Sequence, residues 1–245
     1  MSEFSAFAKP WTDAELDEHG LRPVTDGGRL FCGVTAEAFA INGVTYGWKP
    51  GSKIKIGLEF SRLGQLSDMD CKDAITVALK EIRDCCGGID HEIVSNPDFA
   101  NIYLQVRRLD GAMGVLADCE IPQPGSTPDG TRLRMRFDDS EAWVISETPQ
   151  QGQIDFYRVF LHEVEHGHGL GHKPANIAAA ALIAPTYSRT LRNLQPADKA
   201  EFVRRYGPPK VQPVPPPTPT PGVKPVTVTV EQDGKRWSGP VPRVQ

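Results

Sequence analysis

Residues 162–172 read HEVEHGHGLGH and hold four of the chain's six histidines. His162 and His166 are four positions apart, so on a helix their imidazoles lie on one face and can bind one Zn²⁺. Glu163 follows the first histidine, about 100° further around the helix. From there its carboxylate can reach a water molecule bound to the metal. This spacing predicts a zinc site with an adjacent general base.

The end of the same segment supplies a third ligand. Gly169 can adopt a positive φ and end the helix, so the chain can turn back and bring His172 to the metal. Three protein ligands and one water form the open arrangement of a catalytic zinc, whereas structural zinc sites are closed by four protein ligands. His168 lies off the ligand face, and we interpret it as a solvent-facing or supporting group and not as a ligand. The alternative for the whole segment is a solvated histidine-rich helix end or a structural zinc clip.

The residues before the segment favour a helix that leads into it. Apolar side chains recur there at helical spacing: Ile154, Tyr157, Phe160, Leu161 and Val164. The metal-binding segment is therefore predicted to occupy the C-terminal half of an amphipathic helix whose apolar side faces the core.

The pattern His-Glu-x-x-His-x-x-Gly-x-x-His resembles that of the metzincin zinc peptidases, and several other segments resemble the matrixin branch, the matrix metalloproteinases. Those segments are residues 110–117 (DGAMGVLA), 137–143 (FDDSEAW), 181–187 (ALIAPTY) and 194–207, which ends in Arg-Tyr-Gly. The resemblance extends over about residues 47–207. It implies an α+β fold of the zincin type, with a twisted mixed β-sheet, an active-site helix and a C-terminal helix.

The resemblance also implies an activity, that of a zinc metalloendopeptidase. His162, His166 and His172 would hold one zinc ion, and Glu163 would act as general base on the zinc-bound water. Leu116 and Ala117 would bind the substrate backbone, and Pro185 and Tyr187 would form the wall of the pocket for the residue after the scissile bond. Two alternatives stay open: a catalytically silent binding module on the same zinc fold, and a zinc hydrolase of an ester or a non-protein amide.

Three positions in this range depart from the matrixin pattern. Ile183 stands where the family has the methionine beneath the zinc, and an apolar side chain of similar volume should preserve the packing. Asp118 and Arg136 stand where the family has two histidines of a second, structural zinc site. Because arginine cannot bind a cation, we expect that this second zinc site is absent.

The resemblance implies in addition a structural calcium site. Its carboxylate ligands would be Asp110, Asp138 and Glu141, and its carbonyl ligands would come from Gly111, Met113 and Val115. Six oxygen ligands suit Ca²⁺. The alternative is a solvated turn, since Asp-Gly is common in turns.

Cys32 lies in the sequence Phe-Cys-Gly-Val, sixteen residues before Trp48. In matrixins a Cys-Gly-Val element at this distance ends the propeptide, and its thiolate binds the zinc and keeps the enzyme latent. The match is partial, because Phe31 replaces an arginine of the family pattern. The resemblance predicts that Cys32 is an inhibitory zinc ligand, and the alternative is a buried structural cysteine.

Secondary structure around these residues is indicated by periodicity and capping signals. Strands are predicted at 54–60, 89–94, 101–106 and 115–119, the last as the edge strand beside the active site, where an extended peptide can add to the sheet. Helices are predicted from about 70 to 86, with a capping start at 67–70, and from about 196 to 205. Cys71 and Cys85 would lie about 21 Å apart on one helix, too far for a disulfide. A pairing such as Cys86 with Cys119 stays open.

Composition places this domain between two appendages. We predict a propeptide-like segment at 1–44, the catalytic domain at 45–207, a linker at 208–225 with nine prolines in eighteen positions, and a β-hairpin-like tail at 226–245.

Composition also excludes some function classes. The formal charge of −4 gives no basic excess for nucleic acid, and no apolar run is long enough to span a membrane. We expect a monomer that acts on a protein or peptide. Family resemblance suggests an extracellular location, although the first residues show no signal-peptide pattern.

Overall fold

The computed structural model describes residues 31–32, 46–172, 181–210, 226–232 and 235–241. It divides into two compact units, residues 1–210 and 211–245. Most of the propeptide-like segment and most of the proline-rich linker therefore lie outside the described residues, and the four-part division predicted from composition stays a prediction.

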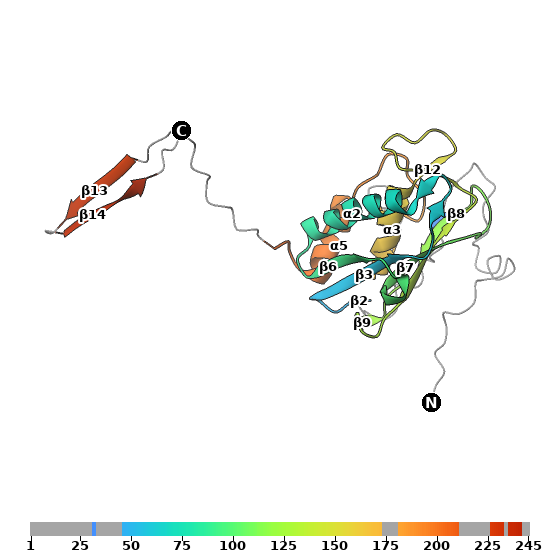
Figure 1. Cartoon of the computed structure of the whole chain (residues 1–245), viewed down its shortest axis with the longest axis horizontal. Helices are drawn as coiled ribbons and strands as arrows, with labels where there is room; N and C mark the ends of the chain where they lie inside the picture. Colours follow the sequence, from blue (N-terminus) through green and yellow to red (C-terminus); the bar gives the residue numbers. More distant parts are fainter. Residues whose placement is uncertain (1–30, 33–45, 173–180, 211–225, 233–234, 242–245) are drawn as a thin grey trace, which may run out of the picture. The chain divides into compact units, whose positions relative to one another are not determined.

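The larger unit is built on a six-stranded mixed sheet with the order β1-β8-β10-β7-β3-β6 (Figure 1). Neighbouring strands run parallel except β8 and β10, which are antiparallel. The strands of this sheet are β1 (Phe31–Cys32), β3 (Ser52–Leu58), β6 (Ile89–Val94), β7 (Ile102–Arg107), β8 (Val115–Cys119) and β10 (Leu133–Asp138). The predicted α+β class is confirmed by this mixed sheet together with its helices.

Short strand pairs extend the unit around this sheet. They are β2 (Gly47–Trp48) with β9 (Pro124–Ser126), β4 (Arg62–Leu63) with β5 (Leu66–Ser67), and β11 (Ala142–Val144) with β12 (Gln153–Asp155). A short 3₁₀ turn, η2 (Pro97–Phe99), connects β6 to β7.

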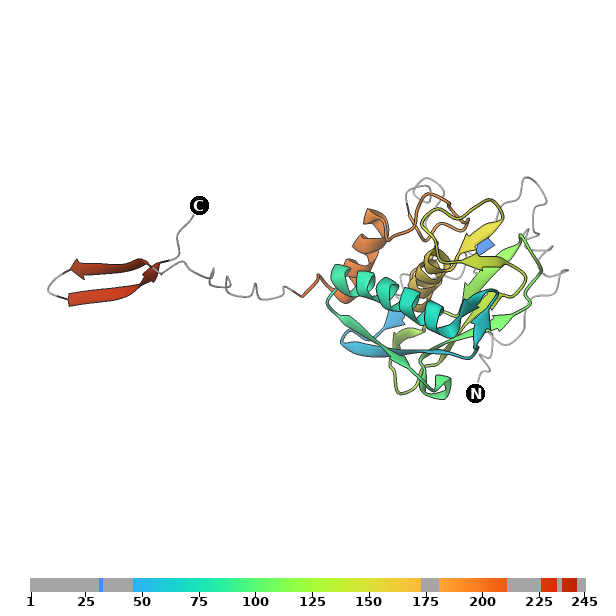
Figure 2. The same ribbon diagram turned by 45° about the horizontal axis from the view of Figure 1, so that its top comes forward.

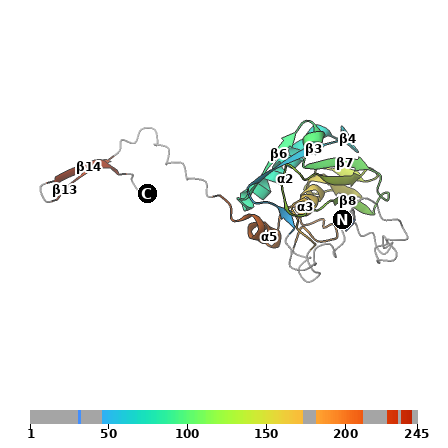
Figure 3. The same cartoon turned by 90° about the horizontal axis from the view of Figure 1, so that it is seen from below.

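Three helices are described in the same unit: α2 (Asp68–Cys85), α3 (Phe156–Gly167) and α5 (Pro196–Tyr206). Helix α2 begins at the predicted capping box, in which Ser67 accepts from the Asp70 N–H and the Asp70 carboxylate accepts from the Ser67 N–H. α2 contacts α3, α5 and β6, and α3 contacts β8 and β10. Figure 3 shows α2 and α3 on one side of the sheet.

The core supports this arrangement with unusually complete burial of α3. Every residue of this helix is buried, and its aromatic side chains Phe156 and Phe160 pack with Phe137 and Trp143 from the sheet side. Helix α2 (teal in Figure 2) contributes an apolar stripe that includes Ile75 and Leu79. A helix with no exposed side is held by its surroundings more than by its own propensity. The packing around α3 therefore fixes its position relative to β8.

The structure corrects the prediction that β8 is the edge strand. β1 pairs with β8 in parallel, with Phe31 opposite Val115 and Cys32 opposite Ala117. An open strand edge offers unpaired backbone groups, and here a segment of the same chain pairs along that edge. The pairing of Cys86 with Cys119, which the sequence left open, is not present, because the four described cysteines are free.

The smaller unit contains an antiparallel hairpin of β13 (Val226–Gln232) and β14 (Lys235–Val241). Its two strands agree with the hairpin that the sequence predicts. Among the described residues, no helix is both long and apolar enough to cross a membrane.

Candidate active site

The zinc-binding segment adopts the predicted geometry. His162 and His166 lie on α3, and the chain turns at Gly169, whose φ is +86°. A Cβ at Gly169 would lie 2.4 Å from the Tyr46 carbonyl oxygen, so both the conformation and the space require glycine. Beyond this turn His172 returns to the helix. The Nε2 atom of His166 lies 3.2 Å from the Nε2 atoms of both His162 and His172.

The three imidazoles present acceptors to one another. The Nδ1 of His162 is 2.8 Å from the Leu182 carbonyl oxygen, and the Nδ1 of His166 is 2.8 Å from the Leu170 carbonyl oxygen. A carbonyl can only accept, so each Nδ1 carries the proton and each Nε2 carries a lone pair. Lone pairs that face one another at 3.2 Å repel unless a cation lies between them. These residues therefore fit a metal ion, and backbone carbonyls that fix the tautomer are the usual support of histidine ligands.

Burial keeps these imidazoles in the neutral, ligating form. It lowers the pKa of His162 to about 4 and, together with the charge of His162, lowers the pKa of His172 to about 3. The pKa of His166 is lowered well below its usual value, first by burial and then by the two neighbouring histidines. Among the described residues, this is the one group of three or more His, Cys, Asp or Glu side chains whose ligand atoms lie within 4.8 Å of one another.

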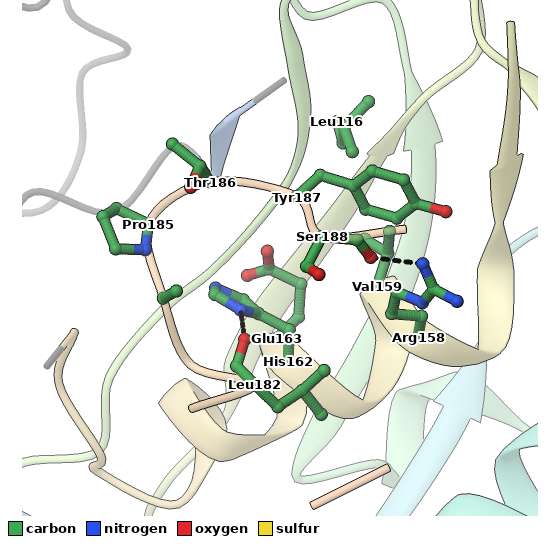
Figure 4. Close-up of a pocket in the computed structure, with 11 residues that line it drawn as sticks. Leu116, Arg158, Val159, His162, Glu163, Leu182, Pro185, Thr186, Tyr187 and Ser188 are labelled. Atoms are coloured by element: carbon green, nitrogen blue, oxygen red, sulfur yellow. Dashed lines mark hydrogen bonds between the residues drawn. The ribbon is translucent and has the colours of Figure 1, made fainter. Parts of the chain in front are cut away.

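A pocket opens beside this centre (Figure 4). The predicted residues Leu116, Pro185 and Tyr187 line it, together with Glu163 and His162. Ala117 is buried and pairs with Cys32 at the strand edge, and it is not among the lining residues. Sequence reasoning missed other members of the lining: Arg158, Val159, Leu182, Ala184, Thr186 and Ser188. The spacing of Arg158, one helical turn before His162, was the signal that could have found it.

Of the two roles predicted for His168, solvent-facing or supporting, the structure agrees with the supporting one. It is fully buried, and its Nε2 lies 2.8 Å from the Nε2 of His91 on β6. Its Nδ1 contacts the Val164 carbonyl, and the hydroxyl of Tyr206 donates to the His168 carbonyl at 2.7 Å. The partner His91 is 77 residues away in the chain, so spacing within the segment could not reveal it. His168 supports the end of α3 from the side opposite the metal ligands.

The proposed calcium ligands converge on one loop, but their carboxylates already accept hydrogen bonds. Asp138 Oδ2 accepts from the N–H groups of Leu109, Asp110 and Gly111 at 3.0–3.2 Å, and its Oδ1 accepts from Ser140. Glu141 accepts from the Met113 N–H at 2.6 Å, and Asp110 accepts from the Val115 N–H.

The acids of this loop also influence one another electrostatically. Burial first, and then the charge of Asp138, raise the pKa of Asp110 and of Glu141. For Asp138 burial opposes ionisation, but the backbone donors outweigh it and lower the pKa. Backbone N–H groups therefore stabilise the negative charge of Asp138.

An ion pair occupies the positions of the second zinc site of the family. The Arg136 Nε donates to Asp118 Oδ1 at 2.9 Å, and a second guanidinium nitrogen contacts Oδ2. The hydrogen bond that Arg136 donates to Asp118 raises the pKa of Arg136. The Asp118 carboxylate is thus engaged by a cationic side chain on the neighbouring strand.

Comparison with known proteins agrees with this geometry. The matrixin family model matches residues 99–207, which include the histidine cluster, the pocket and α5. Matrix metalloproteinase-25 of Mus musculus is 33% identical over 124 residues, which are 47% of this chain and 19% of the relative. The chain thus matches about a fifth of that relative's length. Residues 99–207 are thus similar to the matrixin family, and the described fold and histidine cluster agree with that similarity.

Proposed function

We propose that this protein is a zinc-dependent metalloendopeptidase that hydrolyses peptide bonds in proteins. The observation that carries the proposal is the group of three imidazoles whose Nε2 atoms converge, with the lone pairs of His162 and His166 facing each other beside Glu163. The matrixin match supports the same reaction class. One zinc ion held by His162, His166 and His172 would complete the centre.

The chemistry divides between the metal and the chain. When bound, Zn²⁺ lowers the pKa of a water ligand and polarises the scissile carbonyl. Glu163, which is buried and lines the pocket, accepts the proton of the attacking water and passes it to the leaving amine. Leu182 and Leu170 hold two of the histidines in the required tautomer through their carbonyls. Backbone groups near Ala117 stabilise the oxyanion.

Substrate binding would use the strand and the pocket together. Once β1 leaves β8, an extended peptide can take its place and add to β8 through backbone hydrogen bonds. The side chain after the scissile bond would then enter the pocket lined by Leu116, Pro185 and Tyr187. Backbone pairing tolerates many sequences, so the pocket supplies the selectivity. This arrangement favours a peptide over an ester or another amide.

The decisive experiment compares the Cys32→Ser protein with a Cys32→Ser/Glu163→Ala double variant on a quenched peptide library. We expect both to bind one zinc per chain and the double variant to lose turnover by about 100-fold or more, since general acid–base catalysis contributes that much. Cleavage at similar rates would refute the role of Glu163. Full zinc binding without cleavage by either protein would favour the alternative, a binding module on the zinc fold.

Latency through Cys32 is part of the same proposal. The backbone of Cys32 pairs with Ala117, so the segment that carries it lies on the strand to which a substrate would add. A thiolate bound to the zinc would exclude water from the fourth position. Cys32→Ser should therefore raise kcat/KM of the full-length protein, with Cys85→Ser, a partly buried cysteine of α2, as the matched control. Equal rates for Cys32→Ser and the unmodified protein would remove the inhibitory role and leave a structural one.

Three further assignments remain proposals. Calcium would bind near Asp110, Asp138 and Glu141 with carbonyls of Gly111, Met113 and Val115, and the convergence of these acids on one loop supports the proposal. We also propose an extracellular location and a monomeric state. Sedimentation of the purified protein tests the last of these.

A further inference from the structure

Arg158 places a cation at the inner end of the substrate pocket. It lies on α3 one helical turn before His162, and both side chains line the pocket. Figure 4 shows its guanidinium beside Tyr187 and Ser188, on the opposite side of His162 and Glu163 from Pro185. A substrate side chain that enters past the metal ligands would therefore approach this group.

Among the residues that the structure describes, Arg158 contacts only neutral groups. Its side chain donates to the Ser188 carbonyl, and its Cζ lies 5.2 Å from the centre of the Tyr187 ring. Both partners are neutral. Only 2% of Arg158 is exposed, and within the described residues its Nε has no hydrogen-bond partner and no carboxylate forms an ion pair with it. A buried cation and an unsatisfied donor are both costly.

Other charges near the pocket do not balance this cation. Asp155, which begins α3, accepts from Arg192 at 2.7 Å and from the Ser146 N–H at 3.2 Å. Glu163 lines the same pocket, but its carboxylate is needed for the proton transfer described above. Within the described part of the chain, the positive charge of Arg158 thus has no ion-pair partner, and an incoming carboxylate would neutralise it.

The free volume limits what can enter. The cavity measures about 30 Å³, and one water requires roughly 10–15 Å³ on the same measure. Arg158 therefore leaves space for a short side chain and not for a large apolar one.

We propose that Arg158 makes this pocket selective for a short acidic side chain, with aspartate preferred at the position after the scissile bond. This inference rests on the proposed peptidase function and adds the substrate class. The carboxylate would accept hydrogen bonds from the guanidinium, in a bidentate arrangement if both Nε and a terminal nitrogen donate. Arg158 is then a specificity-determining residue of the site.

The test uses four quenched peptides that differ only at this position: Asp, Asn, Glu and Leu. Asp and Asn have the same shape, so their ratio of kcat/KM isolates the charge. For the zinc-loaded Cys32→Ser protein we expect Asp over Asn by about tenfold or more, since hydrogen bonds to charged groups are worth at least that. Arg158→Gln should bring the ratio near one, and Arg158→Lys, which keeps the charge, should retain much of it.

A binding measurement separates this inference from the proposed function. Fluorescence anisotropy with the Asp and Asn peptides is measured on Glu163→Ala and on Glu163→Ala/Arg158→Gln, two proteins that differ only at Arg158. If Glu163→Ala binds the Asp peptide more tightly than the Asn peptide and Glu163→Ala/Arg158→Gln does not, the inference is supported, even if the Cys32→Ser protein cleaves no peptide. Lack of cleavage would count against the proposed peptidase function and not against this inference. An Asp-to-Asn ratio of one or less with Arg158 intact, or a ratio that Arg158→Gln leaves unchanged, would overturn it. Zinc content and thermal melting verify that the variants fold.

Discussion

The histidine centre and the acidic loop each bring together three potential metal ligands, but the hydrogen bonds that those side chains make without a metal differ. At the histidine centre the backbone takes the Nδ1 atoms of His162 and His166 and leaves the Nε2 lone pairs facing one another. In the acidic loop the backbone donates directly to the carboxylates, and Asp138 alone accepts four N–H groups. The first region is incomplete without a cation, whereas much of the negative charge in the second is already stabilised.

The comparison shows that convergence of ligand residues is a weak criterion for a metal site. What matters is whether the ligand atoms have partners before the metal arrives. A carboxylate surrounded by N–H donors can have a purely structural role, since such donors lower its pKa and fix the loop. We therefore expect a strict metal requirement at the histidines and a smaller calcium effect at the loop.

The largest expected effect is the loss of a histidine ligand. His166→Ala should lower zinc affinity and activity by more than about 100-fold, beyond the 10–100-fold cost of losing an outer partner of a metal ligand. Zinc content after dialysis against a weak chelator measures this. His168→Asn is the matched control, because His168 lies two residues away and outside the cluster. If His168→Asn loses as much zinc as His166→Ala, the assignment of His166 as a ligand and of His168 as a non-ligand is wrong.

Asp138→Asn should lower the free energy of unfolding and leave zinc binding unchanged. Asp138 is fully buried and accepts from four backbone N–H groups, and hydrogen bonds to a charged group contribute about 1.5–3 kcal/mol. We expect a loss of about 2–3 kcal/mol in the free energy of unfolding, measured by urea denaturation, with one zinc retained. Asp139→Asn is the control, since Asp139 is exposed and contacts only the Ser140 hydroxyl in the described residues.

Added calcium sharpens the same comparison. If the loop binds Ca²⁺ in the folded state only, 5 mM CaCl₂ raises the melting temperature of the unmodified protein, by linkage to binding. The increase should be absent in Asp138→Asn. No increase in either protein would leave the loop as a backbone-stabilised turn.

Acid should affect the two regions in separate pH ranges in the metal-free protein. Burial lowers the pKa of His162 to about 4 from an ordinary value of 6.5, so the unfolded state binds more protons between these limits. Stability from the buried histidines is therefore complete above pH 6.5 and falls as pH drops toward 4. The lowered pKa of Asp138, set by burial against the stronger backbone donors, makes its contribution disappear only below its ordinary 3.8.

Urea unfolding at pH 7, 5.5 and 4.5 measures this difference. The unmodified protein and Asp138→Asn should lose stability in parallel over this range. The raised pKa values of Asp110 and Glu141, which burial causes, act in the opposite sense and reduce the slope near pH 4.5. A flat profile from pH 7 to 5.5 would contradict the neutral, buried state of the histidines.

The smallest expected effect concerns the residue that replaces the family's methionine. Ile183 is fully buried and follows Leu182, whose carbonyl accepts from His162. Ile183→Met conserves volume, so the free energy of unfolding should change by less than about 1.5 kcal/mol and kcat/KM by less than about threefold. A large loss of activity would mean that the histidine centre depends on the shape of this side chain.

Local signals in the sequence identified much of this structure. The capping box at Ser67, the strand at 89–94, the strand at 115–119 and the turn at Gly169 all appear where the sequence predicts them. Each depends on a few adjacent residues, namely a side-chain cap, an alternating pattern or a positive φ. The convergence of His162, His166 and His172 was predictable for the same reason, since their spacing is set by one helical turn and one chain reversal.

The remaining features arise from contacts between distant segments. The buried pair of His91 and His168, the pairing of Cys32 with Ala117, and the uncompensated charge of Arg158 depend on how the sheet and helices meet. A sequence shows that Arg158 is near His162, but not that Ser188 and Tyr187 will enclose it. Burial and partner status are tertiary properties, and they decide whether a charged side chain recognises a ligand or only packs.

The hydroxyl of Tyr206 has a consequence for how the active site assembles during synthesis. It donates to the His168 carbonyl at the end of α3 and accepts from the Trp48 N–H, so it joins segments 158 residues apart. Trp48 in turn donates to the Gly167 carbonyl. During translation Trp48 is synthesised first, the histidines later and Tyr206 last. A nascent chain in which the three histidines are already exposed therefore still lacks the Tyr206 hydrogen bonds that hold the end of their helix. We expect peptidase activity to appear only after α5 has emerged from the ribosome.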